Sequence, residues 1–156
     1  MYQSIQDFGT YRDDERVIDQ VVKFNSQFYK LNLDIHETIS MPVTVGEGDR
    51  VESVRTHTPH IKNLYNDNLI PKLTAIHILS SRDDIQGGEF RFKGWNEPTR
   101  IDNYGKVYEH DNPYPTWLNE KGTLFVVPAL EPVWSEMVVS GELNFVQYVF
   151  RGVNYR

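Results

Sequence analysis

Most of this chain is predicted to form short strands, because its apolar residues recur at every second position. From Leu33 the spacing is two, with Leu33 and Ile35 alternating with polar neighbours, as expected of half-buried strands. The pattern continues past Met41 and then through four further segments, which are PKLTAIHILSS, GGEFRF, GTLFVVP and LNFVQYVF. Turn sequences such as GEGD and SRDD separate them. Short strands at regular spacing are typical of sandwiches and barrels, so we predict a mainly β fold.

One helix is predicted before the strands. In DDERVIDQVVKFNSQFYK, which starts at Asp13, the apolar residues Val17, Val21, Phe24 and Phe28 lie at helical spacing. Acidic residues fill the first turn, where the helix dipole favours negative charge. The segment therefore predicts an N-terminal amphipathic helix.

The composition sets limits on size, partners and compartment. The chain has 156 residues, which suits a single domain over residues 1–156 with one sizeable core. A net charge of −6 makes a broad electrostatic grip on nucleic acid or an anionic membrane improbable, so proteins or small molecules are the expected partners. Cysteine is absent, which excludes disulfides, thiolate zinc sites and cysteine nucleophiles. With no apolar leader at the start, we expect a soluble, unsecreted protein.

A long segment at 93–120 interrupts the strand pattern. It is rich in Pro, Asn and Gly, and loops of this length usually have a function. Its aromatic side chains either fold back over the sheet or form a surface that contacts a partner, since aromatics are enriched at interfaces. Both possibilities stay open for the partner-binding candidates, which are Trp95, Tyr104, Tyr108, Tyr114 and Trp117.

Two stretches together resemble a known enzyme family. The sequences LTAIHILSSRDDIQGGEFRF and KGTLFVVP…VVSGELNFVQYVFRG resemble the iron(II)- and 2-oxoglutarate-dependent dioxygenases, specifically the prolyl-hydroxylase-like group. The motif elements fall in the family's order, with Gly87 to Phe90, then Lys121 with Gly122, then Pro128 and Gly141. The resemblance implies a double-stranded β-helix, a form of jelly roll, with an N-terminal helix.

The chain departs from that family at the positions that carry chemistry. In the family, two histidines and a carboxylate hold iron(II), and a basic residue binds the far carboxylate of 2-oxoglutarate. The resemblance puts the His-x-Asp pair at His57 and Pro59, the second histidine at Val133 and the basic residue at Leu143. Only the first of these positions keeps a suitable side chain. Shifting the pair to His60 is worse, because it brings a lysine to the carboxylate position.

We therefore predict a non-catalytic protein with a dioxygenase-like jelly roll, holding no metal ion and no cofactor. Its predicted role is structural or in assembly, through contacts with other protein chains. By analogy at the level of fold, the expected setting is a tailed-phage particle, so that the protein lies in the virion or the host cytoplasm. Jelly rolls often serve as building blocks of viral particles.

Two alternatives remain. The first is an active protein hydroxylase that uses Fe(II) and 2-oxoglutarate at a rearranged site including His57 and Glu131. The second is a small-ligand module whose pocket is lined by Val133 and Leu143. Among the other polar residues, His77 is predicted to be a hydrogen-bonded core histidine, His110 a loop residue and Glu136 an outward-facing residue.

Overall fold

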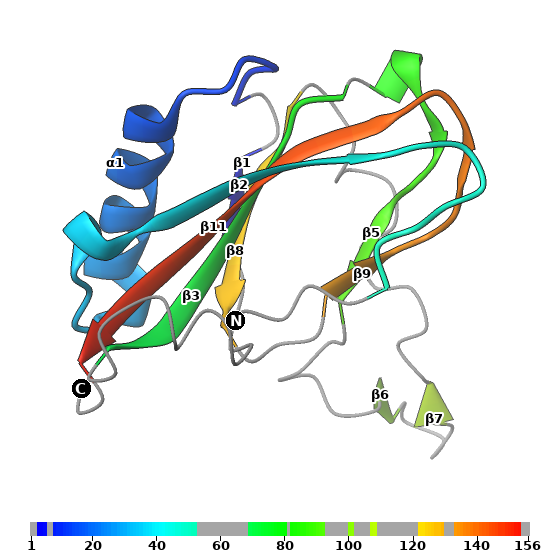
Figure 1. The fold of residues 1–156 in the computed structure, drawn as a ribbon. Coiled ribbons are helices and arrows are strands. Elements are labelled where there is room, and N and C mark those ends of the chain that lie inside the picture. The colour runs from blue at the N-terminus through cyan, green and yellow to red at the C-terminus, as the bar shows by residue number, and fades with distance from the viewer. Residues whose placement is uncertain are drawn as a thin grey trace.

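The computed structural model describes most of the chain. The described residues are 3–5, 8–52, 69–80, 82–92, 100–101, 107–108, 122–129 and 133–153. Figure 1 shows one helix lying against one face of a twisted sheet, with shorter strands beyond the opposite face. Within the described residues, no helix combines the length and the hydropathy that crossing a membrane requires.

A five-stranded antiparallel sheet forms the centre of the molecule. Its strand order is β1 (Gln3–Ile5), β8 (Leu124–Pro128), β3 (Leu69–Ile78), β11 (Leu143–Val153) and β2 (Ile39–Val45). The long strand β11 lies between β3 and β2 and pairs with both along most of its length (Figure 1). The strands predicted from period-two spacing at 41–45, 71–78, 124–128 and 143–150 are all present in this sheet.

Three short antiparallel pairs complete the β structure. They are β4 (Gln86–Gly87) with β10 (Val138–Ser140), β5 (Phe90–Phe92) with β9 (Val133–Ser135), and β6 (Arg100–Ile101) with β7 (Val107–Tyr108). The first two pairs place Phe90, Val133 and Val138 against the five-stranded sheet. The predicted long segment at 93–120 contains the third pair, so its described part is a narrow two-stranded ribbon.

The predicted helix is confirmed, with one correction at its end. Helix α1 (Asp14–Phe24) begins after Asp13, whose carboxylate accepts a hydrogen bond from the Arg16 amide, and it buries Val17, Val21 and Phe24. It continues into the π-helical turn η1 (Asn25–Tyr29). Because a π turn holds more residues than an α turn, Phe28 leaves the buried stripe and is exposed. Its ring still lies near that of Phe24, with the centroids 6.4 Å apart.

Two further expectations about the strands differ from the structure. The predicted strand around Leu33 and Ile35 is absent, and Ile35–Glu37 forms the 3-10 turn η2 instead. There the Asp34 carboxylate accepts a hydrogen bond from the His36 amide, a local bond that competes with strand pairing. Strand β3 in turn begins at Leu69, earlier than predicted. It includes Pro71 where its pairing with β11 shifts register, and such irregular positions tolerate proline.

The alternation along the strands divides the buried residues between two cores. The helix-side core lies between α1 and the sheet and consists of Phe8, Val17, Val21, Phe24, Leu73, Ala75, Leu124, Val126, Val146, Tyr148 and Phe150. The inner core lies on the opposite face, under the short strands, and consists of Val45, Ile76, Ile78, Phe90, Phe125, Val127, Val133, Val138, Leu143 and Phe145. Neighbouring residues of one strand thus enter different cores.

Candidate functional site

The two motif positions that the structure describes, Val133 and Leu143, both lie in the inner core. Val133 begins β9 and pairs with Phe92, while Leu143 begins β11 and pairs with Val45. Each is 0 % exposed. The fold therefore brings these positions into one cluster, as the family resemblance implies, but the side chains that meet there are aliphatic.

Aromatic rings belong to the same hydrophobic cluster as these two residues. Phe90 stands edge-on to Phe145, with ring centroids 5.1 Å apart, and to Phe125, with centroids 5.7 Å apart. Edge-to-face pairs at this separation are favourable beyond the area they bury. Phe90 is itself fully buried, so it acts as the central packing residue of the inner core.

The side chains at the two described motif positions, a valine and a leucine, could ligate neither a metal ion nor a carboxylate. The hydrophobic cluster around them consists of hydrocarbon side chains, which offer no lone pair to a cation and no donor to an anion. Over the described ranges, no three His, Asp or Glu side chains lie close enough together to hold a metal ion. The remaining motif and alternative-site residues, which are His57, Pro59, His60, His110 and Glu131, lie outside the described residues.

His77 is a buried structural histidine, as predicted. It lies on β3 between Ile76 and Ile78, and because those neighbours face the inner core, its ring points to the helix side. Its Nε2 lies 2.6 Å from the Gly9 carbonyl oxygen, so Nε2 carries the proton and donates it. The Phe8 ring packs edge-on at 5.1 Å. Burial lowers the pKa of His77, which favours the neutral ring.

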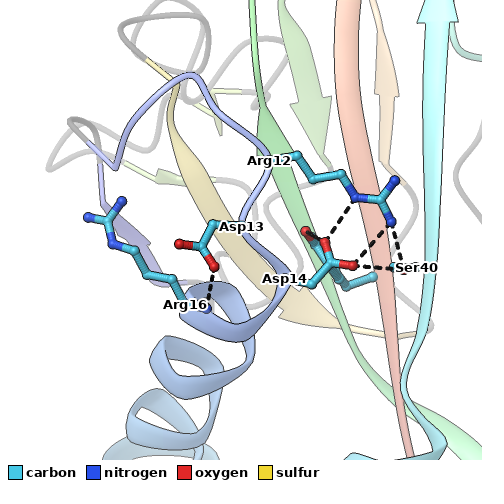
Figure 2. Close-up of polar contacts among 6 residues, drawn as sticks. Arg12, Asp13, Asp14, Arg16 and Ser40 are labelled. Carbon is cyan, nitrogen blue, oxygen red and sulfur yellow. Dashed lines mark hydrogen bonds and ion pairs between the residues drawn. The ribbon is translucent and has the colours of Figure 1, made fainter.

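A polar network that the sequence did not reveal links α1 to the sheet (Figure 2). Asp14 accepts hydrogen bonds from Arg12 at 3.0 and 3.1 Å and from the Tyr148 hydroxyl at 2.6 Å, and Ser40 also contacts it. The pKa of Asp14 is lowered, mainly by the hydrogen bond from Arg12. The pKa of Tyr148 is raised, mainly because the hydroxyl is buried. Because its groups satisfy one another, we interpret this network as a structural tie.

A second set of buried polar residues lies on the inner face, beyond the inner core. Gln147 on β11 pairs with Ile76, and Thr74 on β3 pairs with Val149. Gln147 and Thr74 therefore lie on the inner face, next to the hydrophobic cluster, and both are buried. Arg151, near the end of β11, is 1 % exposed and lies 3.8 Å from the Glu37 carboxylate. The sequence did not indicate that these three residues are buried, because polar residues on strands are usually exposed.

Of the partner-binding candidates, only Tyr108 belongs to a described element. It lies in β7 and its backbone pairs with Arg100 in β6. Trp95, Tyr104, Tyr114 and Trp117 lie outside the described residues. Glu136 is exposed, as predicted.

Comparisons with known proteins show similarity at the level of fold. No profile of a protein family matches the chain, and no curated protein sequence matches it. Among solved structures, a prolyl-4-hydroxylase from Pseudomonas putida aligns with a TM-score of 0.54 and 14 % identity, covering 96 % of this chain and 72 % of that one. A viral collagen prolyl hydroxylase from Paramecium bursaria Chlorella virus-1 aligns with a TM-score of 0.53 and 14 % identity, covering 98 % and 96 %. The chain therefore has a mainly β fold similar to that of prolyl hydroxylases.

Proposed function

We propose that this chain is a non-catalytic jelly roll, a double-stranded β-helix of dioxygenase-like fold, that acts as a structural or assembly component through protein contacts. One observation carries the proposal. Val133 and Leu143, at the positions of the family's second histidine and basic residue, are fully buried among phenylalanine rings. The residues that replace the catalytic groups contribute to packing.

The chemistry of the missing groups supports a loss of activity. Iron(II) stands low in the order of divalent-metal affinities, so its retention depends on several placed ligands and their supporting hydrogen bonds. A valine supplies none. Placing a carboxylate of 2-oxoglutarate against Leu143 would leave a charged group without a partner, at a cost of about 1–3 kcal/mol or more. Both substitutions act against the same reaction.

The protein-contact part of the proposal rests on the segment at 93–120. It carries five large aromatic residues, Trp95, Tyr104, Tyr108, Tyr114 and Trp117, in a stretch otherwise rich in polar residues. Its described ribbon, β6 with β7, is drawn apart from the five-stranded sheet in Figure 1. Aromatic side chains are enriched at protein interfaces. We assign the role to a tailed-phage particle by analogy with the viral use of jelly rolls.

A calorimetric titration tests the catalytic half of the proposal. Fe(II), or Mn(II) as an air-stable substitute, is added to the full chain with and without 2-oxoglutarate, and we expect no binding that depends on the co-substrate. The matched variant is His57→Ala, which should behave like the parent chain. Tight, co-substrate-dependent binding that His57→Ala abolishes would instead support the alternative, an active hydroxylase with a rearranged site.

Loop variants test the protein-contact half. Replacing residues 93–120 by a short Gly-Ser linker is expected to leave the circular dichroism and cooperative unfolding of the core intact while preventing incorporation into assembled particles. The double variant Trp95→Ala and Trp117→Ala serves as the milder change, and Tyr11→Ala, at an exposed aromatic outside the loop, as the control. Incorporation of the loop-deleted chain at the parent level would contradict the role given to this segment.

A further inference from the structure

Strand β10 presents an exposed apolar face to solvent. Val138 points inward and is fully buried, whereas Met137 and Val139 on either side of it are 51 % and 56 % exposed. Met137, directly before β10, and Val139, within it, lie two positions apart, so their side chains leave the chain on the same side and form one small exposed apolar surface. The face is therefore a candidate interaction surface.

This face is rigid, because backbone contacts hold β10 on both sides. Val138 donates to the Asp49 carbonyl at 2.9 Å and accepts from the Gly48 amide at 2.9 Å. On the other side Gly88 donates to the Met137 carbonyl at 3.1 Å. Figure 1 shows the turn after β2, the green segment after β3 and the orange turn before β11 meeting at this end of the molecule.

Glycines allow these turns to come so close. Gly141 has φ +82°, and a Cβ there would collide with the Asp84 carbonyl oxygen. Gly87 has φ +81°, and a Cβ there would collide with the Met137 carbonyl oxygen. Any other residue would strain both the backbone and the contact. A partner would thus meet a preformed surface, which lowers the entropic cost of binding.

The turns around β10 carry the whole net charge of the chain. Residues 46–52, 82–89 and 136–142 hold eight acidic and two basic residues, a net charge of −6, and the rest of the chain holds fourteen of each sign. Seven of the eight carboxylates are exposed, which are Glu47, Asp49, Glu52, Asp83, Asp84, Glu136 and Glu142. We call these turns together with Met137 and Val139 the acidic turn end.

We propose that the acidic turn end docks a basic protein segment that carries an apolar side chain. The carboxylates attract a cationic partner and repel nucleic acid, anionic membranes and the same end of a second copy. The Met137 and Val139 side chains add a short-range apolar contact, which only a partner with an apolar side chain can make. This inference rests on the proposed protein-binding role and names the chemistry of one partner. The binding surface is separate in sequence from the 93–120 segment.

Peptide binding to the full chain tests the inference. The probes are two fluorescein-labelled peptides of equal length and charge, one alternating Lys with Leu and the other alternating Lys with Ser, measured by fluorescence anisotropy at low salt. We expect the Lys-Leu peptide to bind about tenfold more tightly, because it alone covers the apolar face. Binding of both peptides is expected to weaken as salt is raised.

Two matched sets of variants locate the binding. Met137→Ser with Val139→Ser should remove the preference for the Lys-Leu peptide and leave binding of the Lys-Ser peptide unchanged. Asp49→Asn with Glu142→Gln should weaken both peptides and reduce the dependence on salt. The controls, at exposed positions of α1 and η1, are Val22→Ser with Phe28→Ser and Glu15→Gln with Asp19→Asn, and they should change neither property.

Three results would overturn the inference. These are equal affinity for the two peptides, control variants that act as strongly as those at the acidic turn end, and sedimentation showing that Met137 and Val139 instead hold two copies of the chain together. None of them bears on the loop-deletion experiment, because that variant retains the acidic turn end. Failure of this inference therefore leaves the proposed function to its own test.

Discussion

The two faces of the five-stranded sheet are built on different principles. The helix-side face is apolar but contains buried hydrogen bonds, from His77 to Gly9, from Tyr148 to Asp14 and from the Tyr29 hydroxyl to the Val126 carbonyl at 3.1 Å. On the other face, the hydrophobic cluster that contains Val133 and Leu143 is bordered by the buried polar residues Thr74, Gln147 and Arg151. The two described positions that the family resemblance marks for chemistry, Val133 and Leu143, therefore carry aliphatic side chains within this cluster.

This contrast indicates how each face stabilises the molecule. Packing on the inner core is non-directional, so its contribution scales with the apolar area removed from water and does not depend on pH. The hydrogen bonds on the helix side are directional and fix where α1 and the N-terminal residues lie on the sheet. Substitutions on the two faces should thus produce different signatures, which the following three predictions use.

The largest effect is expected from placing a charge in the inner core. Leu143→Lys replaces a fully buried side chain, and its ammonium group would enter a cluster of hydrocarbon side chains. We expect the free energy of unfolding to fall by about 4 kcal/mol, measured by urea denaturation, because uncompensated buried charges typically cost about 3–5 kcal/mol. The conservative Leu143→Met should cost less than about 1.5 kcal/mol.

If Leu143→Lys lowered the free energy of unfolding as little as Leu143→Met does, the contrast drawn between the two faces would fail. That result would mean that water or a polar group reaches position 143, and that the inner core is less closed than its packing around Phe90 implies. The same variant is expected to gain no affinity for 2-oxoglutarate, since one restored cation leaves Val133 without a ligand atom.

The sequence predicted most of the fold because alternation survives in the long strands. Along β11, Leu143 and Phe145 enter one core while Val146 and Tyr148 enter the other, as period two requires. Prediction failed where local backbone bonds or irregular pairing decide the structure. Ile35 lies in a 3-10 turn beside the hydrogen bond from the His36 amide to Asp34, which spacing alone does not reveal.

The site was predictable in one respect. Spacing from Pro128 and Gly141 indicated Val133 and Leu143; the structure places both in one hydrophobic cluster, and their role as former catalytic positions stays a prediction. Sequence reasoning missed the link from Tyr148 to Asp14, because these residues are 134 positions apart and only the packing of α1 on β11 brings them together. The exposed face around Met137 was missed for a similar reason, since it depends on turns that are distant in the chain.

The second prediction concerns the hydrogen bond between helix and sheet. Tyr148→Phe keeps the buried ring and removes the hydroxyl that donates to Asp14 at 2.6 Å. We expect a loss of about 2 kcal/mol in unfolding free energy, because hydrogen bonds to charged groups contribute about 1.5–3 kcal/mol. In an Asp14→Asn background the same substitution should cost less, and a double-mutant cycle measures the difference. Equal costs in both backgrounds would show that the two residues are not coupled.

The smallest effect is a pH dependence expected from His77 on the helix side. His77 lies between Val146 and Leu124 in the sheet, under Phe8 and Gly9, and the charged groups near it are Arg16, Asp13 and Asp14 at the start of α1. Burial lowers its pKa below the ordinary value of 6.5, so below about pH 6.5 the unfolded chain binds more protons than the folded one. Stability should therefore fall as the pH decreases from there.

The dependence of stability on pH that His77 causes has an upper limit, and one substitution separates it from the contributions of other groups. A single proton limits it to about 1.4 kcal/mol per pH unit. In His77→Gln the amide donates to the Gly9 carbonyl as Nε2 does but does not titrate, so the slope between about pH 6.5 and 5 should be smaller. The Asp14 carboxylate, whose pKa is also lowered, loses its contribution only at more acidic pH, which separates the two groups. An unchanged slope in His77→Gln would show that groups other than His77 cause the pH dependence.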